Sequence, residues 1–248
     1  MSILVTRPSP GGEQLVTRLR VLGREAWHFP LIEFSPGREL GTLPAALAAL
    51  APGDLGFVLS QHAVEYARGE LARTGQRWPA QVQWFAIGRT TALAFHDVSG
   101  LNIRYPQDRE ISEVLLQLPE LQNIAGKRAL ILRGNGGREL LGNTLAERGA
   151  HIAFCECYQR CPKHYNGAEE AYRWQQRGVD TLIVTSGEML RQLYTLTPDW
   201  YRHNWLLCCQ LVVVSERLAC LARELGWRDI HVADNADNDA LLRALPSQ

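Results

Sequence analysis

Three serines lie at positions where a side chain could bind a ligand or take part in catalysis. Ser60, Ser186 and Ser215 each follow a short apolar run and each precede a stretch with helical periodicity. A serine in that place can cap a helix through its side-chain oxygen, or it can act as a nucleophile when a His and an acidic residue activate it. Ser60 and Ser186 lie in no G-x-S-x-G elbow and have no evident partners, so capping is favoured over covalent catalysis.

Two glycine-rich turns could bind an anion. Residues 8–12 read Pro-Ser-Pro-Gly-Gly and residues 134–137 read Gly-Asn-Gly-Gly, each between an apolar run and a helical stretch. Such turns present backbone N–H groups and a helix dipole to a carboxylate or phosphate, although ordinary α/β turns explain them equally well. Neither has the Lys-Ser/Thr of a P-loop, and Glu139 stands where a dinucleotide fingerprint needs its third glycine. The turns therefore argue against ATP and nicotinamide cofactors.

A third candidate for ligand binding is the helix start at Gly88, Arg89, Thr90 and Thr91. A strand-like run ends at Gly88 and the helical pattern begins at Arg89. Two hydroxyls, a guanidinium and the first amides of the helix would then be available on one side. The alternative is an ordinary helix start exposed to solvent, which would contain the same types of residue.

The cysteines indicate neither a metal site nor a disulfide framework. Cys155, Cys157 and Cys161 form C-x-C-x3-C, but His151 and His164 complete no recognisable zinc spacing. Six cysteines in a chain of this size without a secretion signal are typical of reduced thiols in the cytosol. We therefore expect no metal, no cofactor and a cytoplasmic location.

These residues must be positioned by alternating strands and helices. Short apolar runs rich in β-branched residues alternate with amphipathic stretches, as in βαβ units around a parallel sheet. The predicted strands are 3–6, 55–59, 82–87, 129–132, 181–185 and 211–214, and the helices begin near Gly12, Gln61, Arg89, Arg138, Glu188 and Glu216. Ligands of open parallel sheets bind beyond the carboxyl ends of the strands. That edge carries Arg7, Ser60, Gly88, Arg133, Ser186 and Ser215.

The two halves of the chain repeat each other. Arg7 and Arg133 end matching apolar runs and differ by 133 − 7 = 126 positions. The same offset separates Ser60 from Ser186, since 186 − 60 = 126. Landmarks that recur in order at one offset indicate an internal duplication, here of an α/β unit about half the chain long.

Two matching segments connect the copies. Residues 29–36 and 155–162 occupy corresponding positions, and both end in Pro. Each is predicted to be an extended connector that leaves a domain.

Charge and length exclude several classes of function. The 26 basic and 26 acidic residues balance, so no net field would draw the chain to nucleic acid or to an anionic membrane. The longest apolar stretch, 205–214, falls short of the roughly 20 residues of a membrane helix, and the first residues resemble a strand more than a signal peptide. We expect a soluble protein that meets any anionic ligand with local donors.

Several motifs together resemble the uroporphyrinogen-III synthase family. They are I-L-V-T-R-P at 3–8, Ser60 after a buried strand, F-A-I-G-R-T-T-A at 85–92, L-R-G-N-G-G-R-E-L at 132–140, C-Y-Q-R at 157–160 and V-T-S at 184–186. The match covers essentially the full chain, and the order of the motifs makes it specific. The resemblance implies an α/β fold of two similar domains with parallel sheets flanked by helices, a two-stranded linker and an active-site cleft between the domains.

The resemblance also implies domain boundaries and a substrate. One domain would combine residues 1–34 with 163–248, the other would hold 37–159, and 30–36 and 157–162 would be the connecting strands. The implied substrate is hydroxymethylbilane, a linear tetrapyrrole with eight carboxylates, and the pathways are those of haem, sirohaem and cobalamin. The donors expected to bind it are Arg7, Ser60, Gln61, Gly88, Arg89, Thr90, Thr91, Arg133, Gly134, Ser186, Gly187 and Ser215.

The reaction implied by the resemblance is a cyclising loss of water. The terminal hydroxyl leaves, and the resulting azafulvenium cation attacks the substituted carbon of the last ring to give a spiro intermediate, whose fragmentation and reclosure invert that ring. The implied proton donor is Tyr158 of the Y-Q motif. A phenol with an ordinary pKa of about 10 stays protonated at neutral pH, and a positioned donor is typically worth about 10²- to 10⁴-fold in rate. Aromatic packing in the connector is the alternative role.

The chain departs from the family at one helix start. Many relatives carry G-x-T-T in the second half, where this chain has Ser215, Glu216, Arg217 and Leu218. We expect Ser215 or Arg217 to replace the missing threonines.

A different class of function is a non-catalytic two-domain protein that binds small anions, since clefts between duplicated α/β units also do this. The family resemblance favours the enzyme. We also expect transient contact with the upstream hydroxymethylbilane synthase. The repeat predicts a monomer, and the balanced charge predicts neither nucleic-acid nor membrane partners.

Overall fold

The chain divides into two compact units. The computed structural model describes residues 1–137 and 139–246. Unit 1 contains Met1–Glu33 and the chain from Cys161 onward, and unit 2 is Phe34–Arg160. Each unit has a sheet that is mainly parallel, with helices on both faces, which confirms the predicted α/β class.

The sheet of unit 1 has five strands in the order β11-β10-β9-β1-β2. The four recorded pairings are all parallel. Read from β2, this is the 2-1-3-4-5 order of a doubly wound sheet, whose topological switch point lies between β1 and β9. The strands are β1 (Ser2–Val5), β2 (Glu25–His28), β9 (Thr181–Ile183), β10 (Gln210–Val213) and β11 (Ile230–Val232).

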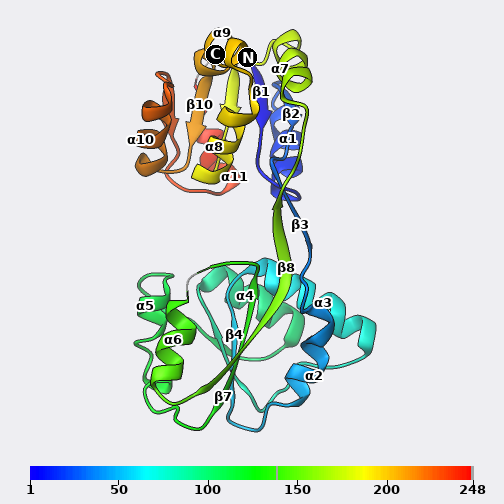
Figure 1. Ribbon diagram of the computed structural model, residues 1–248, viewed down its shortest axis with the longest axis vertical. Coiled ribbons are helices and arrows are strands. Elements are labelled where there is room, and N and C mark those ends of the chain that lie inside the picture. The colour runs from blue at the N-terminus through cyan, green and yellow to red at the C-terminus, as the bar shows by residue number, and fades with distance from the viewer. Residues whose placement is uncertain (138, 247–248) are drawn as a thin grey trace. The chain divides into compact units, whose positions relative to one another are not determined.

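Helices of unit 1 cover both faces of this sheet (Figure 1). One core joins α7 (Gly167–Gln176), α8 (Gly187–Leu196) and α10 (Glu216–Leu225) to the sheet through residues such as Trp174, Leu190 and Ala219. The opposite core includes Leu15 and Leu241 from α1 (Gly11–Val21) and α11 (Asn238–Arg243). The short α9 (Asp199–Asn204) lies between α8 and β10, hence toward the amino ends of the strands.

The sheet of unit 2 has six strands in the order β3-β8-β7-β4-β5-β6. They are β3 (Ile32–Pro36), β4 (Leu55–Val58), β5 (Gln83–Ala86), β6 (Ile103–Arg104), β7 (Arg128–Gly134) and β8 (His151–Pro162). Its helices are α2 (Leu43–Ala48), α3 (Gln61–Thr74), α4 (Arg89–Ser99), α5 (Ser112–Leu115) and α6 (Leu140–Glu147). One core contains α2, α3 and α4, and the other contains α5 and α6.

The strand orders support the predicted duplication. The series β8-β7-β4-β5-β6 of unit 2 corresponds strand for strand to β2-β1-β9-β10-β11 of unit 1. In both units, then, the switch point lies beside a strand with a predicted arginine near its carboxyl end, which is Arg133 in β7 and Arg7 two residues after β1.

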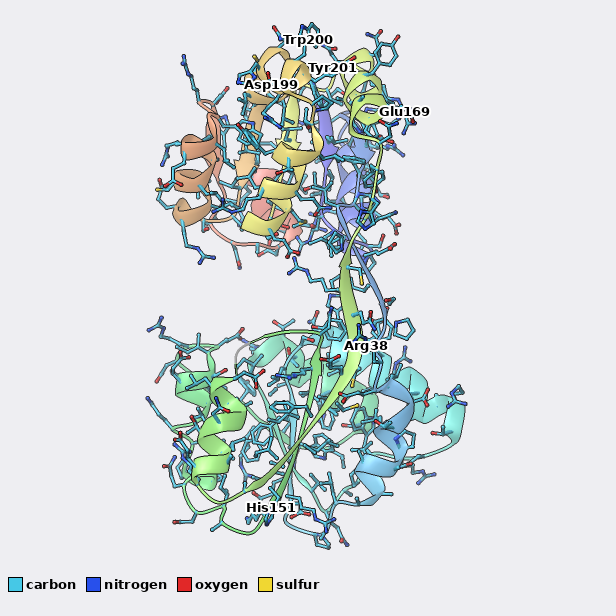
Figure 2. All side chains as sticks on the ribbon, in the orientation of Figure 1. Arg38, His151, Glu169, Asp199, Trp200 and Tyr201 are labelled. Carbon is cyan, nitrogen blue, oxygen red and sulfur yellow. The ribbon has the colours of Figure 1, made fainter. Side chains whose placement is uncertain are left out.

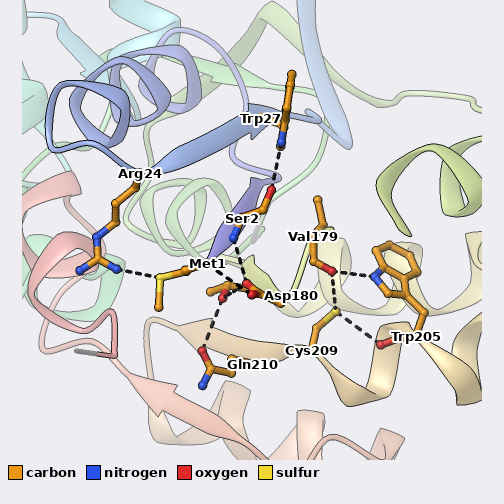
Figure 3. Close-up of polar contacts among 10 residues, drawn as sticks. Met1, Ser2, Arg24, Trp27, Val179, Asp180, Trp205, Cys209 and Gln210 are labelled. Carbon is orange, nitrogen blue, oxygen red and sulfur yellow. Dashed lines mark hydrogen bonds and ion pairs between the residues drawn. The ribbon is translucent and has the colours of Figure 1, made fainter. Parts of the chain in front are cut away.

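A pair of aspartates repeats with the strands. Asp180 accepts a hydrogen bond from the Ser2 amide at 3.1 Å, at the start of β1 (Figure 3). Asp54 accepts one from the Arg128 amide at 2.9 Å, at the start of β7. Both offsets equal that of the sequence repeat, because 180 − 54 = 126 and 128 − 2 = 126. Each aspartate thus ties two adjacent strands together at the amino edge of its sheet.

The predicted elements are confirmed with small shifts at their ends. Every predicted strand is present within two residues at each end, and the helices expected near Gly12, Gln61, Arg89, Glu188 and Glu216 begin there or one residue earlier. The helix start predicted near Arg138 falls at a position outside the described residues, and α6 begins at Leu140. Three short edge or near-edge strands, β2, β6 and β11, had no strand prediction, whereas β3 lies within the connecting strand expected at 30–36.

Unit 1 holds both connecting segments at its own border. The Lys163 amide donates to the Leu31 carbonyl at 2.8 Å, and the Gln192 amide group of α8 donates to both carbonyls, at 2.7 Å to Leu31 and 3.2 Å to Lys163. The Tyr165 hydroxyl donates to the Pro30 carbonyl at 2.6 Å. Burial, followed by nearby carboxylates, raises the pKa of Tyr165 to about 12, so this donor stays protonated at neutral pH.

The described residues contain no group of three or more His, Cys, Asp or Glu side chains arranged to hold a metal ion. No disulfide joins the six cysteines, all of which lie in the described part of the chain. The Cys155 and Cys157 sulfurs are 3.9 Å apart and both are buried. No helix among residues 1–137 and 139–246 has the length and apolar character needed to cross a bilayer.

Candidate functional site

The predicted site residues gather at the carboxyl edges of the two sheets. In unit 2, Ser60 follows β4, Gly88 follows β5, and Arg133 and Gly134 end β7. In unit 1, Arg7 follows β1, and the serine caps of α8 and α10 follow the ends of β9 and β10. Both units therefore place donors at the edge where open parallel sheets bind ligands.

A β-bulge brings Tyr158 to the switch point of unit 2. The pairing of β7 with β8 runs from Arg128–His151 to Arg133–Glu156 and then shifts, so that Gly134 pairs with Tyr158. A bulge inserts one residue into one strand and redirects the side chains that follow it. A side chain at Gly134 would stand 2.6 Å from the Tyr158 ring, so only glycine leaves room for the phenol there.

Ser60 connects the Tyr158 hydroxyl to a helix N-terminus. Its Oγ accepts a hydrogen bond from the Ala63 amide at 3.2 Å, as the N-cap of α3, and donates to the Tyr158 Oη at 3.0 Å. The capping role expected for Ser60 is therefore confirmed. Since the phenol oxygen accepts from Ser60, its own hydrogen is available to a ligand. This arrangement suits a proton donor.

Sequence reasoning missed three further rings around Tyr158. The Phe34 and His62 rings are stacked with centroids 3.9 Å apart, and the Tyr158 centroid lies 5.8 Å from Phe34, 5.5 Å from His62 and 6.1 Å from Tyr66. We call Phe34, His62, Tyr66 and Tyr158 the ring cluster. The signal that could have found two of them is the i,i+4 spacing of His62 and Tyr66 directly after Ser60.

Two members of the ring cluster, His62 and Tyr66, are held in their neutral forms. Burial lowers the pKa of the His62 imidazole, with Glu65 opposing this shift and Arg160 adding to it. Burial, with a smaller contribution from Glu65, raises the pKa of the Tyr66 phenol. Both changes favour the neutral forms of these side chains.

The start of α4 already binds a carboxylate of the protein. The Arg89 amide donates to Glu110 Oε1 at 2.8 Å, and a side chain at Gly88 would collide with the same carboxylate. Thr90 is exposed, whereas Thr91 is 6% exposed and packs into the unit. The first amide of α4 thus has a carboxylate of the same chain as its partner, and Thr91 is buried in the unit. The Gln61 side chain donates to the Thr90 carbonyl at 3.4 Å, which joins α3 to α4.

Two of the predicted arginines have partners within their own units. The Arg133 guanidinium lies 3.8 Å above the Phe154 ring and 3.2 Å from Glu139. Arg7 donates to the Ala236 carbonyl at 2.6 Å and to Asn238 at 3.0 Å, and burial lowers its pKa, with a smaller opposing effect of Asp237.

The two glycine-rich turns differ from the open cradles that the sequence suggested. Gly12 packs against the Arg7 carbonyl and the His28 ring, leaving no space for a side chain. In the other turn, Asn135 accepts a hydrogen bond from the Arg160 amide at 2.6 Å and fixes the turn to β8.

Unit 1 has a pocket between the starts of α8 and α10. It encloses about 600 Å³ and is lined by Ser186, Gly187, Arg191, Ser215 and Arg217, among others. Ser186 caps α8 by accepting from the Met189 amide, and Ser215 caps α10 by accepting from the Leu218 amide, both at 3.2 Å. Two helix N-termini and two arginines favour an anionic ligand, and two glutamates, Glu188 and Glu224, also line the pocket.

Comparisons with known proteins agree with this arrangement. Residues 13–243 match the family model described as uroporphyrinogen-III synthase HemD. The chain is 73% identical to the uroporphyrinogen-III synthase of Salmonella typhimurium and 72% identical to that of Escherichia coli K12, in each case over 99% of this chain and 100% of the relative. The chain belongs to the uroporphyrinogen-III synthase family. It is therefore an enzyme of tetrapyrrole synthesis, a cyclising hydro-lyase, and the non-catalytic binding protein is set aside.

Solved structures of distant uroporphyrinogen III synthases share the fold. A mutant from the extremely thermophilic bacterium Thermus thermophilus aligns with a TM-score of 0.65 at 19% identity, covering 98% of this chain and 96% of that one. A protein from Helicobacter pylori 26695 aligns with a TM-score of 0.59 at 16% identity, with the same coverage. At such low identity these likenesses concern the fold alone.

The departure from the uroporphyrinogen-III synthase family pattern at the α10 start has a structural setting. Ser215 caps α10 with its hydroxyl, and Arg217 lines the pocket in the first turn of the helix. A serine can replace a threonine as a cap because both offer a side-chain oxygen. Arg217 adds a charged donor, its guanidinium, which a pair of threonines would not supply.

Proposed function

We propose that this chain binds hydroxymethylbilane and closes it to uroporphyrinogen III with inversion of the last ring. The observation that carries the proposal is the Tyr158 hydroxyl, held by Ser60 at the carboxyl edge of unit 2 with its own hydrogen available. The donors at the starts of α3, α4, α8 and α10 suit the carboxylates of such a substrate. Each unit would form one domain of the enzyme.

In the proposed reaction Tyr158 protonates the terminal hydroxyl as its C–O bond breaks, and water leaves. The pyrrole nitrogen supplies the electron pair, which gives an azafulvenium cation. This cation is attacked by the substituted carbon of the last ring, and the spiro intermediate fragments to a second cation that recloses at the unsubstituted carbon. The hydrogen lost from that carbon balances the proton lent by Tyr158, so only water is released overall. Positioning and one proton donor are the contributions required of the protein.

Product analysis tests this function directly. Freshly prepared hydroxymethylbilane is given to the purified, metal-free protein, and the oxidised porphyrins are resolved by isomer. We expect predominantly the type III isomer, at a rate proportional to protein concentration. Type I isomer formed at the rate without protein would overturn the proposal.

Glu110 is expected to compete with a substrate carboxylate for the start of α4. Its carboxylate accepts the hydrogen bond of the Arg89 amide, which a substrate carboxylate could otherwise accept. Glu110→Gln removes the charge and keeps a side chain of nearly the same size. We expect KM to fall about 3- to 30-fold with kcat nearly unchanged, the range of one charge-assisted hydrogen bond at a partly exposed site. Steady-state kinetics measures both constants. Glu147→Gln on α6 is the control, and an increase in KM for Glu110→Gln would show that Glu110 serves binding instead.

Arg217 is expected to bind a substrate carboxylate in unit 1. Removing its guanidinium in Arg217→Ala leaves the Ser215 cap and the helix in place. We expect KM to rise about 5- to 30-fold with little change in kcat, and Arg217→Lys to recover part of the loss. The matched control is Arg223→Ala on the same helix, because Arg223 pairs with Glu216 at 2.7 Å and does not line the pocket. Equal effects of the two variants would argue for a change in helix stability only.

We also propose that the enzyme works in the cytoplasm as a monomer and can receive its substrate by transient contact with hydroxymethylbilane synthase. The supporting argument is that hydroxymethylbilane closes spontaneously, so direct transfer would limit the competing type I product. A pull-down with the upstream enzyme at physiological salt tests the contact. Light scattering tests the oligomeric state.

A further inference from the structure

The ring cluster contains more aromatic surface than the proton donor needs. Phe34, His62, Tyr66 and Tyr158 come from β3, α3 and β8, and each is only partly buried. The core rings of the same unit behave differently, since Phe57, Phe85 and Phe95 are completely buried. Core packing therefore does not account for rings that stay partly exposed beside the Ser60–Tyr158 hydrogen bond.

The composition of the cluster suits one kind of ligand. Aromatic faces carry negative potential and attract cations, while a carboxylate gains nothing from them. The charged groups recorded as acting on His62 are Glu65 on α3 and Arg160 on β8, with opposite effects, and the nearby Tyr66 and Tyr158 are phenols. The imidazole itself is neutral at neutral pH because burial lowers its pKa. The four side chains of the cluster thus present no positive charge to a ligand, and the effect of the nearby Arg160 is opposed by that of Glu65.

We propose that the ring cluster stabilises the azafulvenium cations of the reaction. The inference rests on the proposed function, in which loss of hydroxide from the terminal methylene leaves a positive charge delocalised over one pyrrole ring. The departing oxygen takes its proton from Tyr158, so the cation forms next to this residue and to the three rings around it. The second cation, formed when the spiro intermediate fragments, carries the same type of charge and gains from the same faces.

Fluorination of one ring measures this effect without changing its shape much. Tyr66 is the best position, because its ring stacks on Tyr158 at an interplanar angle of 23° while Ser60 is the residue that holds the Tyr158 hydroxyl. Phenylalanine and its mono-, di- and trifluorinated analogues are inserted at position 66. Single-turnover rates with the enzyme in excess then report the chemical step. Each fluorine withdraws π density and weakens attraction to a cation.

The Tyr66→Phe enzyme, which keeps the ring and loses only the hydroxyl, is the reference for the fluorinated series. Along the fluorinated series the rate should fall stepwise, by roughly 2- to 30-fold in total, while KM stays constant. The substrate itself is an anion, so binding has no reason to follow the series. A flat series would overturn the inference, and it would do so while type III product from wild-type protein leaves the proposed function standing.

His62 provides an independent electrostatic test. His62→Asn keeps a neutral polar side chain, whereas His62→Lys places a permanent cation in the cluster. We expect the lysine variant to be at least about 10-fold slower than the asparagine variant in single turnover. The wild-type rate should also fall as the pH drops through the lowered pKa of His62, and His62→Asn should lack this loss. Equal rates for Asn and Lys would contradict the inference.

Controls separate the cation effect from damage to the fold. Trp200 on α9 is 60% exposed and belongs to unit 1 (Figure 2), whereas the cluster belongs to unit 2. Trp200→Leu is expected to leave the rate unchanged, whereas Tyr66→Leu should slow it. Thermal unfolding of all variants identifies any that fail to fold. If Tyr66→Leu fails to fold, the fluorinated enzymes still test the inference, because their rings keep nearly the same size.

Discussion

Tyr158→Phe is expected to slow formation of the type III isomer by about 10²- to 10⁴-fold, the usual contribution of a positioned proton donor. The substitution removes only the phenol oxygen. The ring that packs against Phe34, His62 and Tyr66 remains, so the fold should lose only the Ser60 hydrogen bond, worth roughly 1 kcal/mol. Initial rates and isomer ratios measure the effect, and the share of spontaneous type I product should rise as the enzyme slows.

The matched control for this variant is Tyr66→Phe. It removes a phenol oxygen from the same ring cluster without touching the Ser60–Tyr158 hydrogen bond. A large loss in Tyr158→Phe with a small loss in Tyr66→Phe would assign the effect to the position of the hydroxyl. If Tyr158→Phe retained the full rate, the acid would have to come from elsewhere, and Tyr158 would be a packing residue.

The elements that carry the site could be predicted because their signals are local. The apolar runs before Ser60 and Ser186, and the helical periodicity after them, indicate a strand, a cap and a helix within a few neighbouring residues. The capping hydrogen bonds to Ala63 and Met189 follow from the same local pattern. The internal repeat added long-range information, since an offset of 126 relates corresponding strands of the two sheets.

Other features depend on pairing between distant segments and leave no local signal. The bulge that sets Tyr158 opposite Gly134 is a property of the register between β7 and β8. Glu110 reaches the Arg89 amide from a loop 21 positions away, and nothing in its neighbours marks it as a helix ligand. The sequence therefore indicated Tyr158 only through the family resemblance, and it did not indicate what holds the phenol in place.

Edge strands were missed for a related reason. β6 and β11 have two and three residues, and β2 has Glu25 and His28 at its ends. Such short, partly polar strands have neither a long apolar run nor a clear alternation. They form because the neighbouring strand offers unpaired backbone groups, which is a tertiary effect.

Gly134→Ala is expected to lower the rate about 100-fold although it changes no polar group. The added methyl would stand 2.6 Å from the Tyr158 ring and 3.0 Å from its Oη, so the ring must move and the 3.0 Å hydrogen bond to Ser60 must lengthen. A displacement of about 1 Å in a reacting group typically costs this much in rate. Gly134 is not among the glycines with positive φ, so alanine adds no backbone strain. Overpacking should also cost roughly 1–3 kcal/mol of stability.

Gly142→Ala is the matched control, because its methyl would stand 2.5 Å from the Phe154 ring in the same unit but away from Tyr158. It should lower the melting temperature to a similar extent and leave the rate of the folded enzyme unchanged. A double-mutant cycle completes the test. In Tyr158→Phe, the Gly134→Ala change has no hydroxyl to misplace, so its further cost in rate should shrink to a few-fold. If both substitutions instead multiplied their separate losses, Gly134 would act on the rate independently of the Tyr158 hydroxyl, and its role would be one of binding the substrate.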